Sequence, residues 1–190
     1  MKVLGISGSL REGSHNTKLL RAAAELLPPS AELEVYDGLR AVEPYDADDD
    51  HGAGPRGAAH LRAAIEDADA VLFATPEYNS SVPGQLKNAL DWASRPVREG
   101  AITGKPVSVT GASTGSFGAV WAQAELRKVL NASGARVVGS ELPVAKADSA
   151  FEENGRLADP ELRKALTEIL AELVSEAEQT EAAAAAPIAA

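Results

Sequence analysis

Strand-length apolar runs alternate with helix-patterned segments about five times along this chain, and this alternation limits the fold most strongly. The run Ala70–Ala74 is continuously apolar, which is typical of a strand buried on both faces of a parallel sheet. The expected strands lie near residues 3–6, 33–36, 70–74, 106–110 and 136–138. Parallel strands joined by right-handed helical crossovers predict an α/β, doubly wound sheet of five parallel strands in the order 2-1-3-4-5, with helices on both faces.

The loop after the first expected strand has the features of a phosphate site. It opens directly into a helix, whose unpaired N–H groups and dipole attract anions. The side chains able to hold a phosphate are Ser9, Arg11, Ser14, Asn16 and Thr17. The spacing fits neither the Walker loop nor the dinucleotide-binding glycine pattern. The alternative is a serine-rich turn in which Asn16 and Thr17 only cap the helix.

Two further loops of unusual composition follow the third and fourth expected strands. The three loops span residues 7–17, 75–84 and 111–118. In a doubly wound sheet, ligands bind beyond the carboxyl ends of the strands. We therefore expect the three loops to lie at one edge of the sheet and to converge on one ligand.

The net charge excludes several classes of partner. Lys and Arg number 18 and Asp and Glu number 28, which leaves a formal charge of −10. Binding to nucleic acid or to an anionic membrane depends on basic patches, so we expect neither. The chain has no cysteine, which excludes disulfides and thiolate metal sites, and His15, His51 and His60 show no metal-ligand spacing. We expect no metal site.

The length of 190 residues predicts one domain, which we place at residues 1–178, followed by an Ala-rich, disordered tail at 179–190. The N-terminus enters a strand at once and lacks the apolar core of a signal peptide. No stretch approaches the roughly 18 apolar residues of a membrane span. We expect a cytoplasmic protein without a membrane partner. The acidic, Gly/Pro-rich loop at 45–57 is of a kind that is either functional or mobile.

Three segments carry a resemblance to a known family. They are GSLREGSHNT at 8–17, TPEYNSSVPGQLKNALDW at 75–92 and STGSFG at 113–118, of which the middle one is the most specific. The chain resembles the NADPH-dependent FMN reductase family, which includes chromate and quinone reductases and azoreductase-like flavoproteins. The similarity covers roughly residues 2–170 and leaves out the C-terminal tail.

The resemblance implies a flavodoxin-like fold that binds FMN. Carried over by position, the first loop would hold the FMN phosphate through the five side chains named above. The second loop would run along the isoalloxazine ring through Pro76, Glu77, Tyr78 and Asn79. The third would close the other side of the ring through Ser113, Thr114 and Gly115. The flavin carries the chemistry in such enzymes, so we expect no catalytic side chain.

Several of these residues have simpler interpretations. Glu77 could be only a surface carboxylate, Tyr78 could pack at a helix entrance, and Asn79 could be a turn residue or an N-cap. Trp92 and Trp121 are expected in the core or at an interface rather than against the flavin.

The leading hypothesis is an NAD(P)H-dependent FMN-containing oxidoreductase. It would transfer hydride from NADPH or NADH to FMN and then to a small acceptor such as a flavin, a quinone, an azo compound or chromate. The alternatives are a flavodoxin-type electron carrier and a non-flavin phosphate-ligand protein on the same fold. The choice of nicotinamide stays open, with Lys87, Arg95 and Arg98 as candidate contacts for a 2′-phosphate. Family likeness predicts a homodimer or homotetramer, with the helix from Gly84 to Ser94, Trp92 and Arg95 as the candidate surface.

Overall fold

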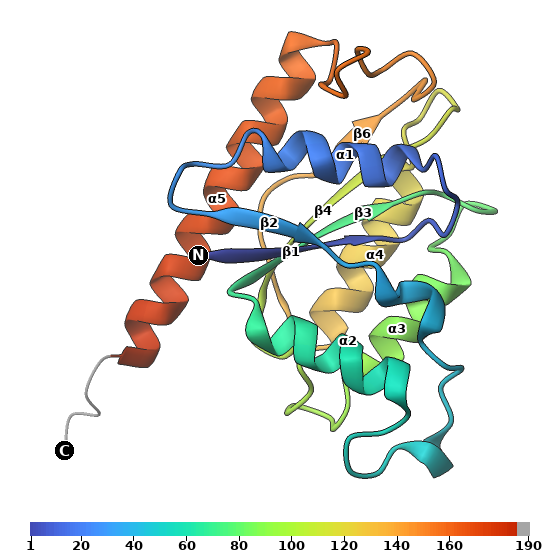
Figure 1. Ribbon diagram of the computed structural model, residues 1–190, viewed down its shortest axis with the longest axis vertical. Helices are drawn as coiled ribbons and strands as arrows, with labels where there is room; N and C mark the ends of the chain where they lie inside the picture. The colour runs from blue at the N-terminus through green and yellow to red at the C-terminus, as the bar shows by residue number, and fades with distance from the viewer. Residues whose placement is uncertain (186–190) are drawn as a thin grey trace.

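The computed structural model describes residues 1–185 and shows one parallel sheet between two layers of helices (Figure 1). The strands are β1 (Lys2–Ser7), β2 (Glu32–Val35), β3 (Ala70–Thr75), β4 (Pro106–Ala112), β5 (Arg136–Val137) and β6 (Leu142–Val144). The α-helices are α1 (His15–Ala24), α2 (Arg56–Asp67), α3 (Gly84–Ala93), α4 (Val120–Ala132) and α5 (Pro160–Ala185). The order β2-β1-β3-β4-β5, with every pair parallel, confirms the predicted topology.

The far side of β4 carries one strand more than the sequence predicts. The two-residue strand β5 pairs with Pro106 and Val107, and β6 pairs with the stretch Thr110–Ala112 farther along the same strand. Two short strands therefore share the position of one long fifth strand. The pattern Leu142-Pro143-Val144 is too short for a periodic signal, and proline is tolerated there because the strand lies at the sheet edge.

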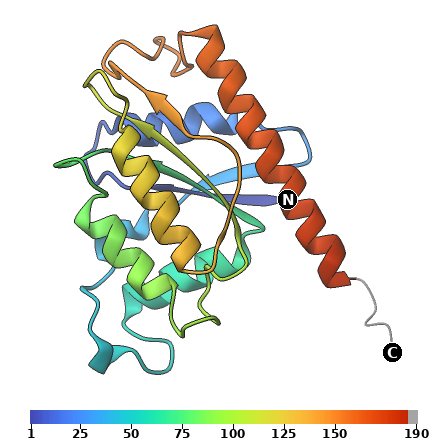
Figure 2. The ribbon, with the colours of Figure 1, turned by 180° about the vertical axis from the view of Figure 1, so that it is seen from behind.

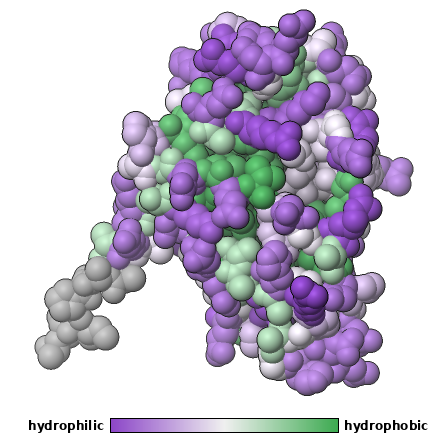
Figure 3. All heavy atoms as spheres, in the orientation of Figure 1, coloured by the Kyte–Doolittle hydropathy of each residue, from purple (hydrophilic) through white to green (hydrophobic). Residues whose placement is uncertain are grey.

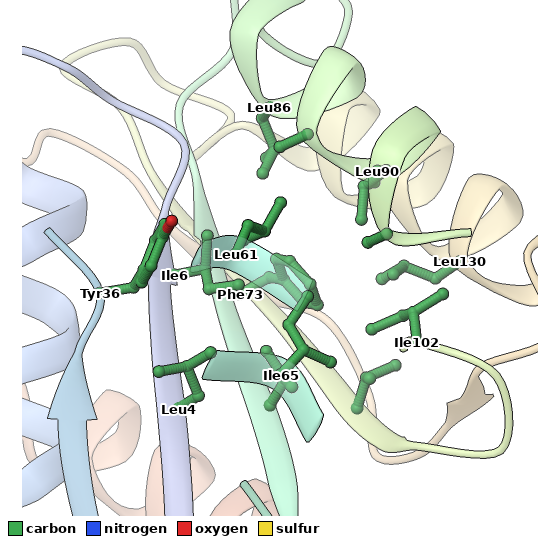
Figure 4. Close-up of a cluster of buried hydrophobic side chains, with 14 of the residues drawn as sticks. Leu4, Ile6, Tyr36, Leu61, Ile65, Phe73, Leu86, Leu90, Ile102 and Leu130 are labelled. Carbon is green, nitrogen blue, oxygen red and sulfur yellow. The ribbon is translucent and has the colours of Figure 1, made fainter. Parts of the chain in front are cut away.

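The two faces of the sheet carry separate cores. Leu4 and Ile6 of β1 point to the face covered by α2, α3 and α4, while Val3 points to the face covered by α1 and α5. Figure 2 shows α3 and α4 lying side by side over the back of the sheet. Figure 4 shows Phe73 at the centre of the first core, surrounded by leucine and isoleucine side chains from the strands and helices. Every residue of β3 is buried, as its continuous apolar run predicts.

Helix α5 is longer than the sequence predicts. It begins after Asp159, with proline at its first position, and continues to Ala185, so residues 179–185 are helical rather than disordered. Leu173, Val174 and Ala177 are buried, and alanine has the highest helix propensity, so both packing and composition favour the continuation. The rest of the predicted tail, residues 186–190, lies outside the described residues.

The surface seen in Figure 3 is mostly hydrophilic, with apolar residues gathered near β2. Leu33 and Val35 of that strand are half-buried and pack on the core beneath α1. In the part of the chain that the structure describes, no helix is both long and apolar enough to cross a membrane.

Candidate functional site

The loops after β1, β3 and β4 meet at one edge of the sheet, on the right of Figure 1, as predicted from the topology. Between them lies a cleft of about 180 Å³, lined by Ser9, Arg11, Ser14, His15, Asn16, Pro76, Glu77, Tyr78, Ala112, Ser113 and Thr114. Nine of the twelve predicted residues therefore come together. The other three, Thr17, Asn79 and Gly115, lie in the same loops outside this lining.

The start of α1 has the geometry of an anion site. Ser14 is the N-cap, and its Oγ accepts a hydrogen bond from the Thr17 N–H at 3.2 Å, so Thr17 serves the helix cap. The preceding N–H groups, those of His15 and Asn16, are at helix positions that have no carbonyl partner within the helix. An anion in front of the helix would receive these groups together with the positive end of the dipole.

Arg11 brings a positive charge to this loop. Its Nη2 donates to the Gly13 carbonyl at 3.1 Å, and its own N–H donates to Ser9 Oγ at 3.4 Å. The side chain is exposed, so its remaining guanidinium donors can reach a ligand. Arginine, hydroxyl groups and helix N–H groups together form the donor set that a phosphate monoester needs.

The side chain of Asn16 has a structural role that the sequence did not reveal. It is only 2% exposed, and its Nδ2 donates to the Ala112 carbonyl at 3.0 Å while its Oδ1 accepts from the Ala112 N–H at 2.9 Å. Both halves of the amide are therefore used to join α1 to the end of β4. Nδ2 carries a second N–H, and the backbone N–H of Asn16 lies in the first turn of α1, so the contact of this residue with a phosphate stays a prediction.

The second loop is a tight hairpin. Tyr78 and Ser81 form a bridge in which each N–H donates to the other carbonyl, at 3.2 and 3.1 Å. Asn79 and Ser80 between them have φ values of 54° and 60°, which is the geometry of a type I′ turn. Asn79 is thus a turn residue, the simpler of its two interpretations, and the Tyr78 side chain remains 53% exposed beside the cleft.

Glu77 is more than a surface carboxylate. Its Oε2 accepts hydrogen bonds from the Trp121 and Ala122 N–H groups, at 3.0 and 3.1 Å, in the first turn of α4. The residue before that helix, Ala119, has no side-chain acceptor, so Glu77 supplies the cap from a distant loop.

Backbone hydrogen bonds to the segment after β6 fix the third loop on one side, and its other side lines the cleft. Ser113 donates from its N–H to the Val144 carbonyl and accepts at its own carbonyl from the Ala147 N–H, both at 3.0 Å. Gly115 accepts from the Lys146 N–H at 3.0 Å. A Cβ on Gly115 would meet only Ser113 Oγ at 3.5 Å, so internal packing does not require glycine there. A flat ligand lying against this backbone would require it.

His15 also lines the cleft. Its Nε2 lies 3.1 Å from Asp148 Oδ1, and its ring stacks on Phe151 with the centroids 6.3 Å apart. Its Nδ1 is buried with no partner among the described residues.

The three basic residues considered for a 2′-phosphate lie elsewhere. Lys87, Arg95 and Arg98 line a separate cavity of about 540 Å³ beside the C-terminal ends of α3 and α4. Those helix ends lead into the start of β4 and β5, so this cavity is at the opposite edge of the sheet from the cleft. The cavity that they line is distinct from the cleft between the three loops, and their contact with a 2′-phosphate stays a prediction.

Trp92 cannot form part of a subunit interface. It is fully buried, and its Nε1 donates to the Glu43 carbonyl at 2.8 Å. Trp121 is 48% exposed and lies edge-on to Phe117, which is 64% exposed, with the ring centroids 4.9 Å apart. The exposed aromatic surface is thus beside the cleft, at the start of α4.

Two other carboxylates accept backbone N–H groups across elements. The Gly57 N–H, at 3.1 Å from Glu43 Oε1, lowers the pKa of Glu43 from its ordinary 4.5. The Ser81 hydroxyl, at 2.6 Å from Glu125 Oε2, lowers the pKa of Glu125.

These lowered pKa values predict acid sensitivity. A carboxylate with a lowered folded-state pKa stabilises the fold above about pH 4.5, and the contribution is lost as the pH falls through the folded value. We expect the free energy of unfolding to fall less steeply below about pH 4.5 in the double variant Glu43→Gln/Glu125→Gln than in the wild type. Urea titrations across this range measure it, with Glu168→Gln on the exposed face of α5 as control. Parallel pH curves for wild type and double variant would contradict the assignment.

Among the described residues, no group of three or more His, Cys, Asp or Glu side chains could hold a metal ion.

The comparisons with known proteins agree with this geometry. Residues 1–149 match the family model described as NADPH-dependent FMN reductase. The chain is 42% identical over 171 residues to the NAD(P)H-dependent FMN reductase of Pseudomonas aeruginosa, a match that covers 90% of this chain and 91% of that one. It is 37% identical over 168 residues to 2-hydroxy-1,4-benzoquinone reductase of a Burkholderia species, covering 87% and 90%.

A solved structure supports the same assignment. The flavoenzyme NAD(P)H:(acceptor) oxidoreductase from Paracoccus denitrificans superposes with a TM-score of 0.81 at 34% identity, over 94% of this chain and 98% of that one. A sheet of order 2-1-3-4-5 with its ligand loops at the carboxyl edge is the flavodoxin-like fold, as the sequence predicted. The chain belongs to the NADPH-dependent FMN reductase family.

Proposed function

We propose that this protein is an NAD(P)H-dependent FMN-containing oxidoreductase that reduces small acceptors such as flavins, quinones, azo compounds or chromate. The observation that carries the proposal is the single cleft that joins the anion site at the start of α1 to the hairpin after β3. Bound FMN would supply the hydride chemistry, accepting from a nicotinamide and delivering to the acceptor. The residues of the chain bind it, orient it and leave one face open.

The residues present fit this cofactor. Arg11, the Ser9 and Ser14 hydroxyls and the first N–H groups of α1 form a phosphate site. Gly115 leaves room for a flat ring beside the third loop. The cleft is smaller than the roughly 300 Å³ that encloses a whole small ligand, so part of the ring would stay open to a second molecule.

Steady-state turnover tests the proposed activity. Without oxygen, we expect NADPH or NADH to be oxidised beyond the amount of bound FMN only when an acceptor such as a quinone is also present, and the ratio of kcat/KM for the two nicotinamides decides the donor. Oxidation of NADPH or NADH that proceeds equally well without FMN would contradict the proposal.

Arg11→Ala should weaken FMN but spare riboflavin, which lacks the phosphate. Removing one charge-assisted contact should lower FMN affinity about tenfold to a hundredfold, and should change riboflavin affinity by less than about twofold. Fluorescence titrations measure both, with Arg98→Ala at the opposite edge as control. Equal losses for the two flavins would place Arg11 against the ring instead of the phosphate.

A flavodoxin-type electron carrier is the second candidate. The exposed Tyr78, Phe117 and Trp121 beside the cleft favour it, because aromatic side chains commonly enclose the flavin in such carriers. This reading predicts bound FMN that neither nicotinamide reduces.

We also propose a homodimer or homotetramer, located in the cytoplasm. Trp92 is buried, so it offers no contact area to a second subunit at the end of α3. The exposed pair Phe117 and Trp121 offers apolar area at the start of α4. Light scattering at working concentration tests the assembly. A monomeric mass would contradict it.

A further inference from the structure

Two carboxylates join the hairpin after β3 to helix α4. One belongs to the hairpin segment and accepts from α4, and the other belongs to α4 and accepts from the hairpin segment. Glu77 of the hairpin segment accepts the Trp121 and Ala122 N–H groups of α4, at 3.0 and 3.1 Å. Glu125 of α4 accepts the Ser81 hydroxyl and the Val82 N–H, at 2.6 and 3.1 Å. The hairpin segment therefore has four hydrogen bonds to α4, all received by carboxylates.

These bonds lie next to the cleft. Pro76, Glu77 and Tyr78 line it, and the bonds of Glu125 reach the segment five residues farther along, just before α3 begins. Within residues 1–185, the hydrogen bonds of the hairpin tip are those of the reciprocal Tyr78–Ser81 bridge, with two residues at positive φ between them. The position of the hairpin at the cleft wall thus depends on the side chains of Glu77 and Glu125. Glu77 belongs to the hairpin segment, whereas Glu125 belongs to α4.

We infer that Glu77 and Glu125 are positioning residues that set the hairpin backbone where the polar edge of the flavin ring will meet it. The inference rests on the proposed function. A flat ring edge is matched by backbone donors and acceptors, and these help binding most when they are fixed before the ligand arrives. Both carboxylates would act in the flavin-free protein, by holding the loop to α4.

Ring-side and phosphate-side contributions can be separated by two ligands. FMN carries both the ring and the phosphate, and lumiflavin carries the ring without the phosphate. We expect Glu77→Ala and Glu125→Ala to weaken FMN and lumiflavin by a similar factor, at least about tenfold. The comparator Arg11→Ala should weaken FMN alone. Glu168→Ala, an exposed glutamate on α5, should change neither.

The amide variants provide a rescue. A glutamine oxygen can accept the same N–H and hydroxyl groups, so Glu77→Gln and Glu125→Gln should bind both flavins within about threefold of the wild type. A role of the negative charge itself would leave glutamine as defective as alanine. That outcome would overturn the inference, as would alanine variants that weaken FMN but spare lumiflavin.

Hydrogen exchange in flavin-free protein tests the same bonds without any ligand. Glu125→Ala should speed exchange of the Val82 amide, and Glu77→Ala that of the Trp121 and Ala122 amides, by at least about tenfold. Unchanged exchange of the Phe73 amide in β3 shows that each variant is folded. Unchanged rates at the three target amides would overturn the inference. If the three amides exchange slowly in the wild type but the protein binds neither FMN nor lumiflavin, the proposed function is contradicted. The inferred role of the two carboxylates in flavin binding then fails with it.

Discussion

Replacing Asn16 by alanine should lower the free energy of unfolding by about 3 kcal/mol. The side chain is 2% exposed and forms two hydrogen bonds with Ala112, one through each half of its amide. Alanine would leave a buried N–H and a buried carbonyl at the end of β4 without partners, and each such group costs about 1–3 kcal/mol. The effect should exceed that of any exposed polar substitution on α1.

Urea denaturation of the flavin-free protein measures the loss. Asn131→Ala is the matched control, because that amide is exposed on α4 and its single bond goes to the Arg127 carbonyl. We expect the control to change stability by less than about 1 kcal/mol. An Asn16→Ala loss as small as the control's would show that water or a shifted backbone satisfies Ala112. A phosphate contact of the side chain would instead appear as lost FMN affinity at unchanged stability.

Replacing Arg62 by alanine should cost about 3 kcal/mol and release the acidic loop. Arg62 Nη2 lies 2.8 Å from Asp50 Oδ1, and the two side chains are only 11% and 19% exposed. Its Nε and Nη1 donate to the Trp92 and Ala53 carbonyls, at 3.0 and 3.3 Å. Its guanidinium carbon also lies 5.3 Å from the centroid of the Trp92 ring.

The variant would leave Asp50 with a poorly hydrated charge and the loop at 45–57 without its main contact to α2. Thermal or urea unfolding measures the stability, and limited proteolysis reports the loop, which should be cut in the variant before the rest of the chain. Arg56→Ala, exposed on the same helix, is the control for loss of a charge. Wild-type resistance to protease in Arg62→Ala would contradict the role of Arg62.

Much of the fold was predictable because it depends on local patterns. The apolar run of β3 and the helical spacing of Leu162, Leu166 and Leu173 in α5 are visible in any window of the right length. The topology then follows from the handedness of crossovers. Strand β6 was missed because three residues carry no period, and the end of α5 was placed too early because an alanine run resembles a low-complexity tail.

The site was predictable in its location but not in the roles of its side chains. The rule that loops at the carboxyl ends of parallel strands converge brought nine of the twelve predicted residues into one cleft. The hydrogen bonds between Asn16 and Ala112 join residues 96 positions apart in the sequence, and no local pattern predicts such a contact. The same holds for Glu43, Glu77 and Glu125, because capping carboxylates that come from another element leave no spacing signature.

Absorbance of the purified protein with FMN, before and after anaerobic addition of NADPH or NADH, tests the central claim most directly. We expect flavin to stay with the protein through desalting, to be bleached by at least one nicotinamide, and to recover when a quinone is added. Arg11→Ala should release FMN during the same desalting. Retained flavin that neither nicotinamide bleaches would favour an electron carrier. Failure to retain FMN at all would contradict the assignment of the cleft to a flavin.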